Sequence, residues 1–232
     1  MFDRILRASS LETAGFRHGF TTRASGDFAT LRDPVPLRQW QERLAEDVGF
    51  DRARFYQTKQ VHGRNVVPAE GDPADLLKIE ADGIVSAREG DAVAIRVADC
   101  VPILLAARDT GRVAAVHAGW RGVEARILEV ALDRLQSKSI LAAVGPHIGP
   151  CCFEVGEDVA ARLGFVVRRD DTTKKAFVDL RAAVRAQLES SGVVTKVDDV
   201  KGCTRCEADR FHSYRRDGDA SGRLVGVIVA RA

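Results

Sequence analysis

Residues 93–122 read VAIRVADCVPILLAARDTGRVAAVHAGWRG, three apolar runs divided by short polar breaks. The runs are residues 92–98, 101–107 and 113–116. Their content of Val, Ile, Leu and Ala favours strands that are buried on both faces. The Asp-Thr-Gly sequence between the second and third runs is typical of a tight turn, so these runs are predicted to form an antiparallel hairpin. Cys100 and His117 lie at opposite ends of this predicted hairpin, where a strand stops and a loop can present a reactive side chain.

The composition limits the class of protein. At 232 residues and 45% hydrophobic, the chain is long enough to bury a large core, and one domain is expected over residues 1–232. The net charge is only +2, and the charges are interspersed, which gives no support for a nucleic-acid surface.

No apolar run approaches the roughly 20 residues of a membrane span. The first 15 residues carry charges where a secretory signal needs an apolar block, so we expect a cytoplasmic protein.

Hydrophobic periodicity outside the central segment predicts further helices and strands. Helices are expected over residues 36–48, 123–137, 157–163 and 180–190. Strands are expected over residues 16–22, 54–61, 82–86, 140–144, 193–197, 211–214 and 224–229. The irregular order of strands and helices favours an α+β fold with mixed sheets.

Three side chains with metal-binding chemistry share one sequence context. His62 in QVHG, Cys100 in ADC and His117 in AVHAG each lie beside a turn or a small residue at a predicted strand end. Two imidazoles and a thiolate suit zinc, and three protein ligands leave one position open, as in catalytic sites. An alternative of equal weight is ordinary packing, since cysteine is often buried for packing alone. Another alternative is a cysteine hydrolase in which Cys100 is the nucleophile and His117 its base.

Several other residues are candidates for binding a ligand. Arg121 in HAGWRG would hold an anionic group beside the metal, and Trp120 would stack on a flat ligand. Each has a plain alternative, a surface ion pair for Arg121 and core packing for Trp120. Arg23 and the Arg215–Arg216 pair are further candidates for an anion site.

The other four of the five cysteines fit no complete motif. Cys203-x-x-Cys206 resembles half a zinc knuckle, but there is no second CxxC. The adjacent Cys151 and Cys152 cannot both point into one small site if the backbone there is extended. We therefore expect these four cysteines to be structural or incidental thiols. His147 lies in the GPHIGP loop, which could face the same cleft as the three candidate metal ligands. For this side chain a local hydrogen bond is the favoured role.

Six segments of the chain, in order, resemble the YfiH-type family: QVHG, ADGIVS, ADCVPILL, AVHAGWRG, GPHIGPCCFEVG and SYRRDGDASGR. The resemblance extends from about residue 21 to the end of the chain. This family is also called the laccase-domain or multicopper polyphenol oxidoreductase family. Its members are described as purine nucleoside phosphorylases with adenosine deaminase activity and as peptidoglycan editing factors.

The resemblance implies a fold and a metal site. The implied fold is a single α/β/β/α layered sandwich with mixed sheets, similar to the catalytic domain of a cytotoxic necrotizing toxin. The implied metal is zinc, with copper less favoured. The implied metal ligands are His62, Cys100 and His117. Catalytic roles are expected for Cys100, His117 and Arg121, and contacts to substrate or phosphate for Arg23 and Arg121.

The implied partners are phosphate and small purine nucleosides such as adenosine, inosine and methylthioadenosine. For deamination of adenosine, zinc would lower the pKa of bound water towards about 7, and the hydroxide could attack C6 of adenine. Phosphorolysis instead needs a phosphate that arginine positions beside the anomeric carbon. Asp99 is a candidate proton donor to the purine, or else it supports the neighbouring ligand Cys100.

Other activities remain open at this point. One is a cysteine-type amidase that edits peptidoglycan precursors, and another is a binding module without catalysis. A copper-dependent polyphenol oxidase is disfavoured, because a blue-copper site usually adds an axial methionine and Met1 is the only methionine. Multicopper chemistry would also need many more than the five histidines present.

Overall fold

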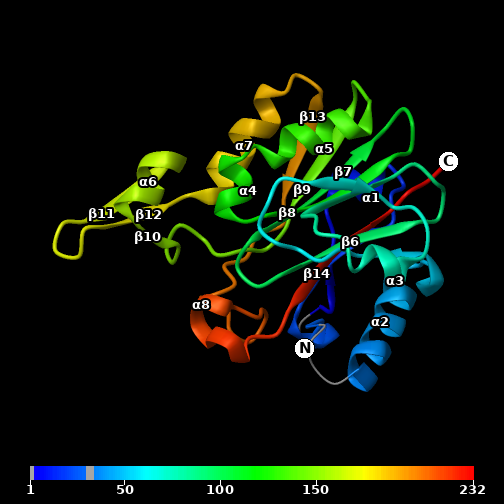
Figure 1. The fold of residues 1–232 in the computed structure, drawn as a ribbon, viewed down its shortest axis with the longest axis horizontal. Helices are drawn as coiled ribbons and strands as arrows, with labels where there is room; N and C mark the ends of the chain where they lie inside the picture. The colour runs from blue at the N-terminus through cyan, green and yellow to red at the C-terminus, as the bar shows by residue number, and fades with distance from the viewer. Residues whose placement is uncertain (1–2, 30–33) are drawn as a thin grey trace.

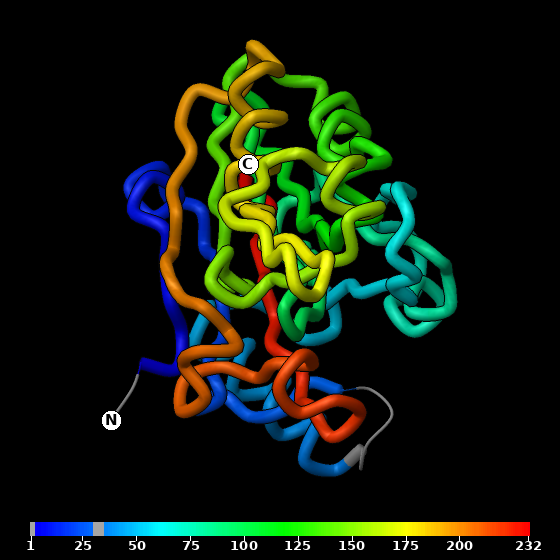
Figure 2. Tube along the Cα trace, turned by 90° about the vertical axis from the view of Figure 1, so that its left-hand side faces the viewer, coloured from blue at the N-terminus to red at the C-terminus, as the bar shows by residue number. Residues whose placement is uncertain are grey.

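Two β-sheets packed face to face form the centre of the molecule. The structure is a computed structural model that describes residues 3–29 and 34–232. Helices cover the outer face of each sheet, so the order of layers is α/β/β/α, as predicted. In the view of Figure 2, helix α2 (Pro34–Val48) and helices α5 (Ile127–Leu135) and α7 (Leu180–Ser190) lie at opposite ends of the molecule.

The larger sheet has six strands in the order β13-β9-β7-β8-β5-β4. Their bounds are β4 Val66–Pro68, β5 Gly83–Ser86, β7 Val101–Ala107, β8 Val113–Ala118, β9 Ile140–Val144 and β13 Val194–Asp199. Strands β7 and β8 form the predicted antiparallel hairpin at the centre of this sheet. The parallel pairs β4–β5 and β9–β13 at the two edges make the sheet mixed.

The second sheet has five strands in the order β1-β2-β14-β6-β3. Their bounds are β1 Ile5–Leu6, β2 His18–Thr21, β3 Phe55–Tyr56, β6 Ala92–Val97 and β14 Leu224–Val229. The first apolar run of the central segment is therefore β6, which pairs with β14 and not with the hairpin. The chain crosses from one sheet to the other between Val97 and Val101, around the break at Asp99 and Cys100.

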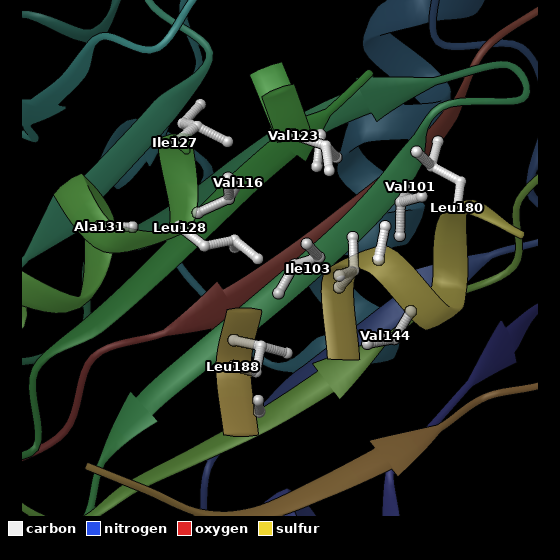
Figure 3. Packing of buried hydrophobic residues seen from close by; sticks show 14 of the residues in the cluster. Val101, Ile103, Val116, Val123, Ile127, Leu128, Ala131, Val144, Leu180 and Leu188 are labelled. Carbon is white, nitrogen blue, oxygen red and sulfur yellow. The ribbon is translucent and has the colours of Figure 1, made fainter. Parts of the chain in front are cut away.

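Alternate residues of β7 supply two different cores. Leu104 and Ala106 pack between the sheets, against residues such as Ile95 of β6. Ile103 and Leu105 face the opposite way, into the core beneath α5 and α7. Figure 3 shows this core, in which side chains of both helices lie over the strands of the larger sheet. Since both faces of the hairpin are covered, its strands are apolar throughout, as in a buried parallel sheet.

The predicted helix over residues 123–137 is wrong in its bounds. One helix, α4, runs from Trp120 to Glu124 and a second, α5, begins at Ile127. Arg126 between them has a φ of 61°, a left-handed conformation that ends the hydrogen-bonding pattern of α4. Gly119 precedes α4, so the end of β8 turns directly into a helix.

The remaining elements are short. They are α1 Ser9–Thr13, α3 Pro73–Leu76, β10 Glu154–Gly156, α6 Glu157–Leu163, β11 Val166–Asp170, β12 Lys175–Val178 and α8 Tyr214–Asp217, with 3-10 turns at Arg23–Ser25, Arg52–Arg54 and Gly218–Ala220. Strands β10, β12 and β11 form a small sheet that projects with α6 to one side (Figure 1). The predicted strand over residues 211–214 is wrong, because α8 begins at Tyr214. Among the described residues, the helices are all too short or too polar to cross a membrane.

Candidate active site

His62, Cys100 and His117 converge at one end of the two-sheet core. Their potential ligand atoms all lie within 4.8 Å of one another. The two imidazole rings are edge to face, with centroids 4.8 Å apart and an angle of 80° between their planes. His117 is buried, Cys100 is half-buried and His62 is exposed, so the cluster opens to solvent on the His62 side.

The hairpin brings Cys100 and His117 together. Pro102 of β7 is directly opposite His117 of β8, and Cys100 precedes β7 by one residue. The expectation that Cys100 and His117 occupy opposite ends of the hairpin is therefore wrong, because both lie at its open end. In an antiparallel pair, the start of the first strand and the end of the second meet at the open end.

Asp82 holds this cluster in place, and its role was missed from the sequence. The side chain is completely buried and accepts a hydrogen bond from His117 Nδ1 at 2.7 Å. It also accepts hydrogen bonds from the backbone N–H groups of His62 at 2.9 Å and Gly63 at 2.7 Å. One carboxylate thus orients the His117 ring and fixes the loop that carries His62. The only sequence signal was an acidic residue at the start of a buried strand in ADGIVS.

Replacing Asp82 by asparagine is expected to weaken metal binding about tenfold, because carboxylates that orient a histidine ligand contribute 10- to 100-fold to metal affinity. Zinc affinity measured by competition with a chromophoric chelator checks this. Asp75→Asn is the control, since Asp75 is exposed and pairs with Lys78 on the surface. Equal zinc affinity in both variants would contradict the role of Asp82.

The backbone also leaves room for the cluster at Gly119. A Cβ at this position would lie 3.0 Å from Cδ2 of His62 and 3.2 Å from Sγ of Cys100. The absence of a side chain at Gly119 therefore lets His62 and Cys100 approach each other. Because Nδ1 of His117 is bound to Asp82, its Nε2 is the atom available to a metal. The donor set and its spacing fit one ion that keeps an open position.

The protonation of the cluster also suits metal binding. Burial opposes ionisation of the Cys100 thiol, but the adjacent His117 and His62 outweigh it and lower its pKa to about 6. Burial likewise disfavours protonated His117, but Cys100 and Asp82 outweigh it and raise its pKa to about 9. The metal-free site is therefore a thiolate–imidazolium pair at pH 7. A metal that binds Nε2 of His117 would displace the proton from that nitrogen.

The cluster lies in the wall of a cavity of about 860 Å³. Trp120 and Arg121 line the same cavity, as their predicted roles require, and the Arg121 guanidinium lies over the Trp120 ring at 4.5 Å. The cationic lining residues are Lys59, Arg96, Arg121, Arg215 and Arg223, and the acidic ones are Asp99 and Asp219. The apolar and aromatic ones include Val97, Trp120, Ile148, Phe153, Leu180 and Tyr214.

Arg96 is the lining residue with the clearest capacity for an anion, and it was not singled out from the sequence. Its Nη2 donates to the Thr58 carbonyl at 3.0 Å, whereas its buried Nη1 has no hydrogen-bond partner among the described residues. Burial, with a smaller effect of nearby Arg223, lowers the pKa of Arg96 to about 10, so the side chain stays charged at pH 7. A buried charged donor without a partner favours binding of an anion.

Of the other arginines predicted to bind an anion, only some line the cavity. Arg23 is not among the cavity-lining residues, and its Nη1 donates to the Ala208 carbonyl at 3.0 Å. Arg215 lines the cavity, whereas Arg216 is held by Asp217 and by backbone carbonyls, including that of Thr204. Of the predicted arginines, Arg121 and Arg215 are thus the two that can reach a ligand in the cavity.

Two further residues from the sequence analysis have local roles. The carboxylate of Asp99 accepts hydrogen bonds from the Thr204 hydroxyl and the Arg215 backbone N–H, each at 2.6 Å. These bonds tie two loops to the residue beside Cys100. His147 is buried, and its Nδ1 donates to the Gly145 carbonyl at 2.8 Å, which confirms the local hydrogen bond expected for it.

The sequence argument that kept Cys151 and Cys152 apart applies only to an extended backbone, and that condition is not met. Their backbone is a turn, since the N–H of Cys152 bonds to the Gly149 carbonyl at 2.9 Å. Both sulfur atoms therefore point into one cluster, together with those of Cys203 and Cys206.

Comparison with known proteins gives a consistent family assignment. A family model described as "Multi-copper polyphenol oxidoreductase laccase" matches residues 17–231. A protein of Deinococcus radiodurans named purine nucleoside phosphorylase is 40% identical over 97% of this chain and 92% of its own. A protein from an unknown prokaryote, named adenosine deaminase RL5, is 36% identical over 81% of this chain and 79% of its own.

Solved structures share the fold. The crystal structure of YlmD from Geobacillus stearothermophilus superposes with a TM-score of 0.85 at 30% identity. The match covers 100% of this chain and 98% of that one. This chain and YlmD therefore share the layered fold over nearly their whole lengths.

Proposed function

The chain belongs to the multi-copper polyphenol oxidoreductase laccase family. We propose that this member of the family is a zinc-dependent purine nucleoside phosphorylase that also deaminates adenosine. The convergence of His62, Cys100 and His117 on the wall of a cation-lined cavity carries the proposal. Relatives named purine nucleoside phosphorylase and adenosine deaminase indicate the substrate class.

Zinc suits the three-ligand site better than copper. All five histidines lie in the described residues, and His18, His147 and His212 each bond to a backbone carbonyl away from the cluster. A multicopper centre would need several of them together. The only methionine is Met1, on which the sequence argument against a blue-copper site rests, and it lies outside the described residues. A zinc ion held by His62, Cys100 and His117 would supply a Lewis acid and would lower the pKa of bound water to about 7.

Phosphate is expected to bind beside Arg96. Arg96 lines the cavity and its buried Nη1 has no hydrogen-bond partner among the described residues, while Arg121, Arg215 and Arg223 line the same space. In phosphorolysis, a phosphate oxygen forms a bond to C1′ of the ribose while the bond from C1′ to the purine nitrogen breaks. The arginines orient the phosphate for this displacement, and the purine nitrogen takes up a proton as it leaves.

The purine base is expected to bind the apolar part of the cavity. Trp120 and Phe153 present aromatic surface, and Ile148 adds an aliphatic side chain. Stacking on such surfaces is suited to a flat heterocycle. A cavity of about 860 Å³ lies within the range of ligand-binding pockets and exceeds what one nucleoside needs, which leaves room for phosphate.

Arg96→Gln is expected to raise the KM for phosphate about tenfold, since hydrogen bonds to a charged group contribute roughly 1.5–3 kcal/mol. Adenosine deamination needs no phosphate and should change less. Steady-state kinetics of both reactions check this, with Arg38→Gln as control because Arg38 is exposed on α2. A loss of deamination equal to the loss of phosphorolysis would contradict a phosphate role for Arg96.

The whole proposal is tested with purified protein, adenosine and phosphate. Adenine with ribose 1-phosphate, or inosine with hypoxanthine, should form and be detected by liquid chromatography. Removing the metal with a chelator should stop turnover, and adding zinc should restore it. Turnover that survives full removal of zinc would overturn the zinc dependence, and no nucleoside conversion at all would overturn the function.

A cysteine hydrolase is the second candidate, because one arrangement in the site favours it. Sγ of Cys100 lies within 4.8 Å of a ring nitrogen of His117, and Nδ1 of His117 bonds to Asp82, which is the Cys-His-Asp order of a catalytic triad. Such an enzyme would act as an amidase on peptidoglycan precursors. Metal-free protein that cleaves muropeptides and loses this activity on alkylation of Cys100 would establish this candidate in place of the first.

A further inference from the structure

Four cysteines from two distant segments form a second cluster that contains none of the residues of the first. All four sulfur atoms lie within 4.8 Å of one another. The Cys152–Cys206 separation is 3.3 Å, and those of Cys151 from Cys203 and from Cys206 are both 3.6 Å. We propose that this cluster is a structural zinc site with Cys151, Cys152, Cys203 and Cys206 as its four ligands.

The spacing of the sulfur atoms suits one tetrahedral ion. Four sulfur atoms at 2.3 Å from a zinc ion lie about 3.8 Å from each other, close to the observed separations. A disulfide would need about 2.0 Å, and all four cysteines are free thiols. An iron–sulfur cluster places several of its own atoms between the cysteines and holds them further apart. Four cysteines with no position left open are the usual ligand set of a structural zinc.

The backbone around the cluster is arranged as it is around a metal-bound thiolate. The N–H of Gly149 donates to Sγ of Cys203 at 3.2 Å, and the turn it begins directs Cys151 and Cys152 inward. A Cβ on Gly149 would lie 3.3 Å from Sγ of Cys151 and 3.4 Å from Sγ of Cys203. Glycine therefore permits the close approach of the two cysteine segments. Hydrogen bonds of this kind orient metal ligands.

The surrounding charge suits a zinc ion with four thiolates, whose net charge is −2. Lys175, Arg205 and Arg215 line a hollow beside Cys152, together with Glu154 as the acidic residue. Three cations against one acid leave positive charge next to the anionic centre. This arrangement lowers the cost of holding four thiolates in one place.

A metal here would join a loop that forms part of the cavity wall to a second loop that bonds to a residue of that wall. The first loop contains Ile148 and Phe153, which line the cavity. The second contains Thr204, whose hydroxyl bonds to Asp99 beside the ligand Cys100. The second zinc would thus stabilise the active-site wall from outside, without contact to substrate.

Metal analysis of purified protein tests the proposal independently of any purine chemistry. Wild-type protein should contain two zinc ions per chain. Cys203→Ser/Cys206→Ser should retain one, and the matched control His62→Ala/His117→Ala, which keeps every cysteine, should also retain one. X-ray absorption of the zinc in this control should show four sulfur atoms at about 2.3 Å.

The expected cost of losing the second zinc is a melting temperature lower by roughly 10 °C in Cys203→Ser/Cys206→Ser. If that variant does not fold, a mercurial thiol reagent added to His62→Ala/His117→Ala should release its one zinc in step with the reaction of four of its five thiols. The proposal is overturned if this control holds no zinc, if its zinc has nitrogen ligands, or if iron takes the place of zinc.

Discussion

His117→Ala is expected to lose the catalytic zinc and to reduce adenosine phosphorolysis by about 10³-fold, roughly 4 kcal/mol of transition-state stabilisation. In the proposed site His117 would be one of three ligands, and its ring is the one that Asp82 orients. Without it, Cys100 and His62 would have to hold the ion as a pair, which is too few ligands for a stable zinc site.

The fold of His117→Ala should survive. The neighbours Val116 and Ala118 stay buried in the helix-covered core, and the backbone pairing of β7 with β8 does not involve the imidazole. Asp82 also keeps its bonds to the N–H groups of His62 and Gly63. Zinc content, phosphorolysis rate and thermal unfolding by circular dichroism together measure the effect.

His18→Ala is the matched control for this experiment. His18 is also a buried histidine with two hydrogen bonds, to Phe16 and Ala8, but it lies outside the cluster. It should lose stability and keep both zinc and turnover. Zinc content that is undiminished in His117→Ala would mean that these three residues do not form the metal site.

The sequence predicted the central elements of the fold because their signals are local. Uninterrupted apolar runs indicated strands buried on both faces, and the hairpin over residues 101–118 is present. The pairing of β6 with β14 could not be predicted in this way, because the two strands are more than a hundred residues apart and both are simply apolar. Which sheet a buried strand joins depends on tertiary packing.

The candidate site was predictable only in its most distinctive residues. Histidine and cysteine in small-residue contexts identified His62, Cys100 and His117. Asp82 and Arg96 were missed because an acid before a strand and an arginine within one have no local signature. Their importance comes from burial and from the groups that the fold places beside them.

The four-cysteine cluster was missed for a different reason. The sequence argument against it applies only where the chain is extended at Cys151 and Cys152, so that successive side chains point to opposite faces. The turn at Gly149 does not meet that condition. The missing second CxxC is replaced by two adjacent cysteines from a loop more than fifty residues away. The spacing of a zinc knuckle is therefore only one of the ways to bring four thiols together.

Alkylation of Cys100 in metal-free protein should follow a pH profile with its midpoint near 6. The cause is the pairing of the thiolate with His117 and His62, which outweighs burial and lowers the pKa to about 6. The thiolate is present above that pH and is lost as the pH falls through it. In His117→Ala the midpoint should rise above about 8, towards the ordinary value of a cysteine thiol.

The shift in midpoint is a better measure than the rate at one pH, because a thiolate of lower pKa is also a weaker nucleophile. Mass spectrometry of the Cys100 peptide after treatment with iodoacetamide separates this thiol from the four others. Zinc added beforehand should protect Cys100 in wild-type protein at every pH where the ion binds, since the same sulfur would then be a ligand. A midpoint near 8.5 in wild-type protein would mean that His117 and Cys100 are not paired, and both the metal site and the alternative Cys-His-Asp arrangement would lose their basis.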